Sequence, residues 1–74
     1  MDIRESLVDR HELGSHTADV FQLNIFGGIG DHAVRVYNSD GFEVVTQHCN
    51  GRKAADKFAV RALEILEKPL NGGY

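Results

Sequence analysis

The chain has 74 residues, a formal net charge of -3 at pH 7 and a single cysteine, Cys49. A domain this short buries only about 60% of its unfolded surface, so we expect one domain with one small core. A lone cysteine excludes an intramolecular disulfide, and the sequence contains neither a membrane-length apolar run nor a signal-peptide pattern. We therefore expect a cytoplasmic protein that does not bind membranes, and the mild acidity argues against indiscriminate binding to polyanions.

Residues 1–15 are predicted to form either a short N-terminal helix or an extended arm. Asp2 and Glu5 have the spacing of a helix capping box, and Gly14 suits the left-handed position that follows a helix. The apolar residues of the segment form only an irregular stripe, at Ile3, Leu7, Val8 and Leu13. Both alternatives therefore stay open.

Residues 17–48 are predicted to form a three-stranded sheet. Side chains alternate between two faces in 17–26, 32–37 and 42–48, as they do along strands. A glycine-rich loop separates the first two strands, and the tight turn at 38–41 separates the last two. Connections this short join antiparallel neighbours, so the sheet is expected to be a meander.

Residues 51–68 are predicted to form the longest element, an amphipathic helix. Asn50 is the expected N-cap, and Pro69 ends the helix before a tail at 69–74. Apolar residues recur at helical spacing at Ala55, Phe58, Ala59, Ala62, Ile65 and Leu66. We expect this stripe to pack on one sheet face, formed by Phe21, Leu23, Ile25, Val34, Val36, Phe42 and Val44. The predicted fold is therefore an α+β two-layer sandwich.

The second face of the predicted sheet is unusually apolar for a surface without a partner. It would expose four residues among polar neighbours, namely Val20, Phe26, Tyr37 and Val45. Such a patch is typical of a protein-protein interface. The alternative is that the N-terminal segment folds over it.

The order α-β-β-β-α and the last helix resemble the double-stranded RNA-binding domain family. The helix likeness lies in Arg52-Lys53, Ala55, Lys57, Ala59 and Ala62-Leu63, and Gly30-Asp31-His32 resembles the loop that carries a histidine in that family. The resemblance implies that duplex or structured RNA would be bound by His32, Arg52, Lys53, Lys57 and Arg61. The alternative is an ordinary solvated face, in which Asp56 pairs with Arg52 and Glu64 pairs with Lys68 at i, i+4 spacing.

Catalysis and metal binding are not expected. The glycines at 27–30 precede a strand instead of the helix that a phosphate loop requires. The potential metal ligands are the four histidines and the cysteine, and they lack compact ligand spacing: His11, His16, His32, His48 and Cys49. His48 and Cys49 point to opposite faces because they are adjacent on a strand. We expect no cofactor and no small-molecule substrate.

The sequence therefore predicts a small non-enzymatic module that acts through protein association. It would do so as a homodimer, or as an inhibitor or adaptor of a larger target. The alternative is a module that binds duplex or structured RNA.

Overall fold

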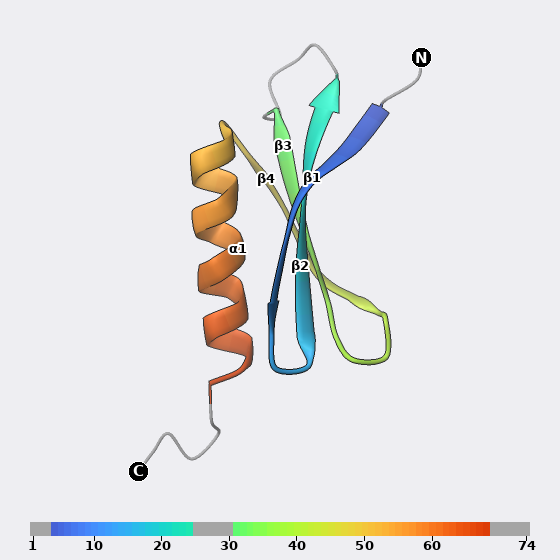
Figure 1. Cartoon of the computed structure of the whole chain (residues 1–74), viewed down its shortest axis with the longest axis vertical. Coiled ribbons are helices and arrows are strands. Elements are labelled where there is room, and N and C mark those ends of the chain that lie inside the picture. Colours follow the sequence, from blue (N-terminus) through green and yellow to red (C-terminus); the bar gives the residue numbers. More distant parts are fainter. Residues whose placement is uncertain (1–3, 25–30, 69–74) are drawn as a thin grey trace.

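The computed structural model describes residues 4–24 and 31–68 and combines one sheet with one helix. The elements are β1 (Arg4–Leu13), β2 (His16–Asn24), β3 (His32–Tyr37), β4 (Glu43–Cys49) and α1 (Arg52–Leu66). All strand pairs are antiparallel in the order β1-β2-β3-β4, and α1 lies against one face of the sheet (Figure 1). The predicted α+β class, with an antiparallel meander and a C-terminal helix, is confirmed. The sheet has four strands, however, where three were predicted.

The N-terminal segment is a strand, so the helix considered for residues 1–15 is wrong. β1 pairs with β2 along its whole length. Gly14 has a φ of 60° and forms the two-residue connection between these strands with Ser15. A glycine with positive φ suits a tight hairpin as well as a helix end, which is why the pattern was ambiguous. The extended alternative is closer to the structure, and residues 1–3 lie outside the described part.

The turn between β3 and β4 is the tight turn predicted at 38–41. The Asn38 side-chain oxygen accepts hydrogen bonds from the backbone N–H groups of Asp40 (2.9 Å) and Phe42 (3.0 Å). Gly41 has a φ of 86°, and its N–H donates to the Asn38 carbonyl at 3.0 Å. The asparagine side chain thus closes the turn, while the glycine supplies the left-handed conformation.

The helix begins and ends differently from the prediction of 51–68. Its N-cap is Gly51, which makes no side-chain capping hydrogen bond, so Asn50 is not the cap. The carboxylate of Asp31 instead accepts a hydrogen bond from the Gly51 N–H at 2.7 Å. The helix ends at Leu66, and the predicted tail at 69–74 lies outside the described residues. No helix among the described residues is long and apolar enough to span a membrane.

The core lies between α1 and the two central strands. Val20 of β2 lies opposite Val34 of β3, and both side chains are fully buried. Ala55 and Ala59 of the helix are also fully buried, and because they are small they allow the helix to approach the sheet closely. The buried cluster among the described residues consists of Ala18, Val20, Val34, Val36, Ala55, Ala59 and Leu63.

The face of β2 that meets the helix is the opposite of the predicted one. The sequence predicts Phe21 and Leu23 beneath the helix, but Val20 occupies that position and Phe21 lies on the other face. Both faces of β2 carry apolar residues, so alternation does not decide between them. The small helix residues favour small partners, and Ala18 and Val20 meet that requirement. Ile25, also predicted on this face, lies outside the described residues.

The predicted helix-facing set is correct for β3 and wrong for β4. Val34 and Val36 are fully buried in the core as expected. Phe42 and Val44 are instead 67% and 44% exposed, whereas Val45 packs against the core. The register of β3 and β4 shifts next to Val36, so one extra residue interrupts the alternation that the sequence suggested.

The sheet face away from the helix is crossed by charged side chains. Arg35 lies 5.7 Å from the centre of the Phe21 ring and forms an ion pair with Glu5. Arg10 donates two hydrogen bonds to Asp19, at 2.7 and 3.1 Å, and Asp19 is only 6% exposed. The Arg35 guanidinium thus covers the Phe21 ring, and both arginines are paired with carboxylates. This face is not the apolar second face that the sequence predicted.

Leu63→Ala should lower the free energy of unfolding by about 2–5 kcal/mol, because it opens a cavity between helix and sheet. Ile65→Ala on the same helix is the matched control, and it should cost less than about 1 kcal/mol since Ile65 is 60% exposed. Urea denaturation followed by circular dichroism measures both. If Leu63→Ala does not fold, Leu63→Val should still show a loss of about 1 kcal/mol. Equal losses for Leu63→Ala and Ile65→Ala would contradict the packing described.

Candidate functional site

The two flanks of α1 differ in chemistry. Successive helix residues are rotated by about 100°, so side chains on the two flanks face different edges of the sheet. Arg52 and Asp56 contact β1 through hydrogen bonds. On the opposite flank, Phe58 and Ala62 are partly buried against the core, and helical spacing places Ile65 on the same flank. The β1 flank therefore carries the polar contacts with the sheet, although Val60 on that flank and Leu7 and Leu13 on β1 are also exposed.

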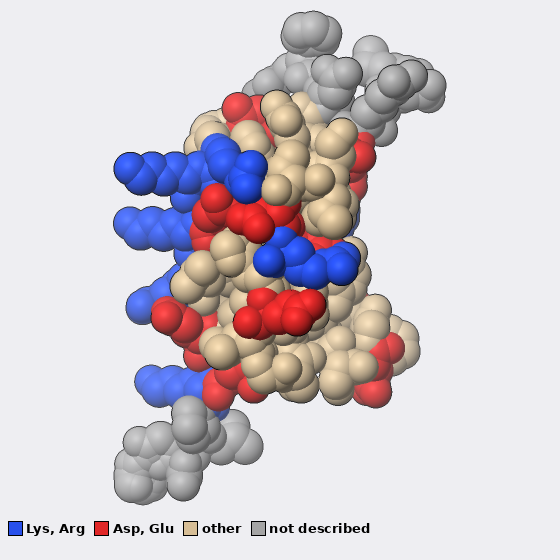
Figure 2. Space-filling view, viewed as in Figure 1, with Lys and Arg blue, Asp and Glu red and all other residues tan. Residues whose placement is uncertain are grey.

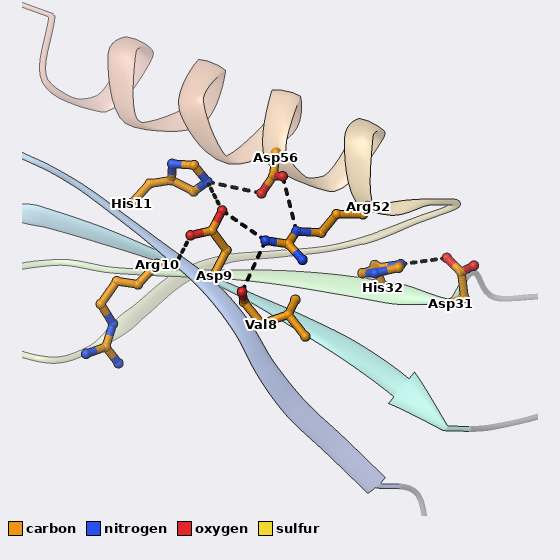
Figure 3. A network of polar contacts seen from close by, with 8 residues as sticks. All are labelled: Val8, Asp9, Arg10, His11, Asp31, His32, Arg52 and Asp56. Carbon is orange, nitrogen blue, oxygen red and sulfur yellow. Dashed lines mark hydrogen bonds and ion pairs between the residues drawn. The ribbon is translucent and has the colours of Figure 1, made fainter.

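A four-residue polar network joins β1 to the start of α1 (Figure 3). His11 Nε2 lies 3.1 Å from Asp56 Oδ1 and 3.3 Å from Asp9 Oδ2. Arg52 donates to Asp56 at 3.1 Å, lies 3.3 Å from Asp9, and donates to the Val8 carbonyl at 3.1 Å. The Arg10 backbone N–H and the Arg52 guanidinium both lower the pKa of Asp9. The network ties the strand to the helix.

The same network contains a donor set that could hold a metal ion. Asp9, His11 and Asp56 each offer a ligand atom, and these atoms lie within 4.8 Å of one another. One imidazole and two carboxylates suit a divalent transition metal. Arg52 already pairs with both carboxylates, however, and the imidazole already has both as partners. The contacts are therefore fully explained by an ion-pair network.

A second set of polar contacts between sheet and helix, or tie, holds the C-terminal end of the helix. Glu67 Oε2 accepts hydrogen bonds from the backbone N–H of Ser15 (2.9 Å) and from its hydroxyl (3.0 Å), and it lies 2.5 Å from His16 Nδ1. A Cβ atom at Gly14 would displace the carboxylate end of the Glu67 side chain and so disturb this contact. The positive φ of Gly14 is the feature that strains any other residue at this position.

A third tie holds the N-terminal end. Asp31 Oδ1 lies 2.8 Å from His32 Nδ1 and accepts the hydrogen bond from Gly51 described above. The Gly51 bond and then the His32 contact lower the pKa of Asp31. His11, His16 and His32 thus each meet a carboxylate at the boundary between sheet and helix.

The β4 side of the molecule has no such tie among the described residues. Val45, Cys49, Phe58 and Ala62 are only partly buried there, and Ile65 is largely exposed. β4 is also an edge strand of the sheet, so part of its backbone has no strand partner on its outer side. Sequence reasoning missed this surface because it assigned Phe58 and Ile65 to the core stripe.

The outward face of α1 carries a row of cations. Figure 2 shows Lys and Arg side chains projecting side by side from the helix edge of the molecule. Arg10, Arg35 and Arg52 each pair with a carboxylate elsewhere. The cations of the row are exposed and form no ion pair with any described residue: Lys53, Lys57, Arg61 and Lys68.

Three of the five residues predicted to bind RNA lie in this row, and two do not. Lys53, Lys57 and Arg61 are separated by four residues each, which places them on one line along the helix. Arg52 is held in the network with β1, and His32 is 7% exposed beside Asp31. The sequence did not reveal these two contacts because their partners lie on distant segments.

The four residues predicted to form a protein interface do not come together. Val20 is fully buried beneath the helix, and Val45 is half-buried on the same side of the sheet. Tyr37 lies opposite Thr17 on the other face, where it is half-buried. Phe26 lies outside the described residues. The expected exposure of Val20 is therefore wrong, and the patch as predicted does not form.

Comparisons of the chain with protein-family models, with curated proteins and with solved structures found no match. The side chains described above are therefore the basis for the proposed function. Among the described residues, the β4 edge with its apolar neighbours and the row of cations on α1 are surfaces without partners.

Acid should destabilise the protein by weakening the ties at both helix ends. Hydrogen bonds with His16 and Ser15 lower the pKa of Glu67 from its ordinary value of 4.5, and the Gly51 N–H lowers that of Asp31 from 3.8. A carboxylate with a lowered folded-state pKa contributes stability above its unfolded pKa, and this contribution is lost as pH falls through the folded-state value. We therefore expect the urea midpoint to fall between about pH 5 and about pH 2.

Glu67→Gln is the control for this prediction. It removes one of the titrating groups, so the variant should lose less stability over the same pH range. The measurement is the urea midpoint by circular dichroism at several pH values. A variant with the same acid dependence as the parent would contradict a contribution from Glu67.

Proposed function

We propose that the protein is a non-enzymatic binding module that associates with another polypeptide along β4 and the adjoining flank of α1. The partner is either a second copy or a larger target that the module inhibits or recruits. The observation that carries this proposal is the difference between the two sides of the molecule. Both outer strands are edges with exposed apolar residues nearby, but β1 is charged and joined to α1 by ion pairs, whereas β4 is nearly uncharged and has no such ion pair with α1 among the described residues.

The two edge strands support the choice of β4. Natural edge strands avoid unwanted pairing by means of charges and bulges. β1 has both, since it contains a register shift between Leu7 and Asp9 and carries many charged side chains. β4 has a register shift only at its start, opposite Val36 and Tyr37, has one residue with a permanent charge, Glu43, and has a sequence, EVVTQHC, that is rich in β-forming residues. A strand of this kind is suited to strand addition by a partner.

The apolar residues beside this edge support the same side. Val44 is 44% exposed, and Phe58 is only half-buried on the neighbouring helix flank. Exposed apolar residues that gather on one side are typical of interfaces. The opposite sheet face is less suitable, because Arg35 and Arg10 already pair there with Glu5 and Asp19 and a partner would have to desolvate these charges.

Site-specific photo-cross-linking in cells that produce the protein tests this proposal. A photoreactive amino acid at Thr46 on β4 should give a cross-linked adduct, because Thr46 is exposed along the proposed contact. The same amino acid at Glu12 on the β1 edge is the matched control and should give little or none. Ile65→Glu, combined with the Thr46 probe, should reduce the adduct strongly, since it places a charge in the apolar flank.

The mass and the yield of the cross-linked adduct distinguish the possible partners. An adduct of twice the chain mass supports a second copy, and a discrete adduct of another mass supports a larger target. Equal yields from Thr46 and Glu12, or an adduct that Ile65→Glu does not affect, would contradict association through the β4 side.

The row of cations on α1 favours a second candidate function, the binding of a duplex nucleic acid. The domain is acidic as a whole, yet Lys53, Lys57 and Arg61 share one helix face without an ion pair to any described residue, and Lys68 follows the end of the helix. Cations four residues apart stand about 6 Å apart along a helix, a spacing that suits successive phosphates of a nucleic-acid backbone. The observation concerns backbone contacts and implies no sequence preference.

Lys53→Glu combined with Lys57→Glu should abolish binding to duplex RNA, and both exposed positions should tolerate the change without unfolding. A gel shift at low salt measures binding, and circular dichroism checks the fold. If all four cations contact phosphates, the logarithm of the affinity should fall with that of the salt concentration with a slope of about -3 to -4. The matched control, Glu64→Lys, should strengthen binding. A parent protein that does not bind at low salt would exclude this candidate.

A further inference from the structure

We propose that the partner on the β4 side is a second copy of this chain, joined by antiparallel pairing of β4 with β4 about a two-fold axis at Gln47. This inference rests on the proposed function and specifies its occupant. The two sheets would form one continuous sheet of eight strands, with both helices on the same face. An arrangement of this kind uses the same surface in each copy and is closed, as most small oligomers are.

The charges of the edge strands favour a second copy that contributes β4. Pairing of β4 with β1 would join unlike surfaces head to tail and would build an open chain. It would also bring the charged and bulged β1 edge against a mostly uncharged strand. Pairing of β1 with β1 would meet the same bulge twice. β4 with β4 avoids both problems, because the pairing strand is regular beyond its first residues.

The register follows from where β4 is regular. The shift opposite Val36 displaces the first two residues of the strand, and the continuous ladder with β3 runs from Val45 to Cys49. Gln47 is the midpoint of this ladder, so an axis there pairs the longest regular stretch with itself. An axis nearer Glu43 would place the irregular part of one strand against the other.

This register makes the strand complementary to itself. Val45 of one copy lies opposite Cys49 of the other, on the side of the sheet that carries the helices. Thr46 lies opposite His48 on the other face, and the two Gln47 amides meet at the axis, where they can bond to each other. No two like charges are opposed.

The flank of α1 that carries Phe58 and Ile65 also favours a second copy as the partner. Phe58 and Ile65 lie on the flank of α1 opposite Asp56, which contacts β1. A two-fold axis perpendicular to the sheet turns the same flank of the second helix toward the first. Apolar surface of one copy then faces apolar surface of the other, while the cations of both helices remain on the outer face. A small domain with a thin core gains stability from such burial.

Cysteine cross-linking tests both the occupant and the register. Gln47→Cys in a Cys49→Ser background places the two thiols opposite each other at the axis, within the Cα separation that a disulfide requires. Mild oxidation should therefore convert most of the purified protein to a covalent dimer on a non-reducing gel. Glu12→Cys in the same background, on the opposite edge, is the matched control and should stay monomeric.

The parent chain supplies a second control. With the axis at Gln47, the two Cys49 residues are separated by four residues along the paired strands, about 14 Å, which is too far for a disulfide. The parent should therefore form a non-covalent dimer in sedimentation equilibrium but should not cross-link on oxidation. Burial raises the pKa of the Cys49 thiol, which also slows its oxidation.

Three results would overturn the inference. They are a parent chain that stays monomeric at high concentration, a Glu12→Cys variant that cross-links as well as Gln47→Cys, and a dimer in which Gln47→Cys does not cross-link. The first of these leaves the proposed function standing if the Thr46 probe still captures a protein of another mass in cells. Failure of both the cross-linking at Gln47 and the capture at Thr46 would remove the function as well.

Discussion

A single helix has to cover a four-stranded sheet, and most other features follow from this constraint. A helix with its side chains is about 10–12 Å across, while neighbouring strands are about 4.8 Å apart, so one helix covers roughly two strands. Here α1 lies over β2 and β3, and Ala55 and Ala59 let it come close. The outer strands are left at the two flanks of the helix. On each flank, the part of the outer strand that the helix does not cover has to be stabilised in another way.

The contacts on the β1 side and on the β4 side differ. On the β1 side, polar ties link the strand and its turn to both ends of the helix, through Arg52 and Asp56 at one end and Glu67 at the other. Exposed ion pairs contribute little stability, so their main effect is to fix the position of the helix over the sheet. On the β4 side, apolar residues such as Phe58 remain partly uncovered. A partner there would complete the layer that one helix leaves incomplete.

Local patterns in the sequence predicted the local structure well. Alternation located β2 to β4, and Asn38 and Gly41 marked the turn between the last two strands. The predictions were wrong where one sequence pattern is compatible with two structures. Gly14 suited a helix end and a hairpin equally, and both faces of β2 carry apolar residues. The ties between β1 and α1 were invisible because residues some 45 positions apart give no local signal, as the contact of His11 with Asp56 shows. The cations Lys53, Lys57 and Arg61 were found because they repeat every four residues on one element.

The bulge in β1 makes this strand unusually sensitive to changes in length. Beyond the register shift, Asp9 lies opposite Val20, which places it on the helix side, whereas Leu7 lies opposite Phe21 on the other face. Deleting Val8 would restore a regular ladder and remove a residue that packs against the core. Inserting one residue between His11 and the turn at 14–15 would instead turn Asp9 and His11 to the wrong face and break the network with the helix. Point substitutions along β1 should therefore accumulate during evolution far more readily than insertions or deletions of a single residue.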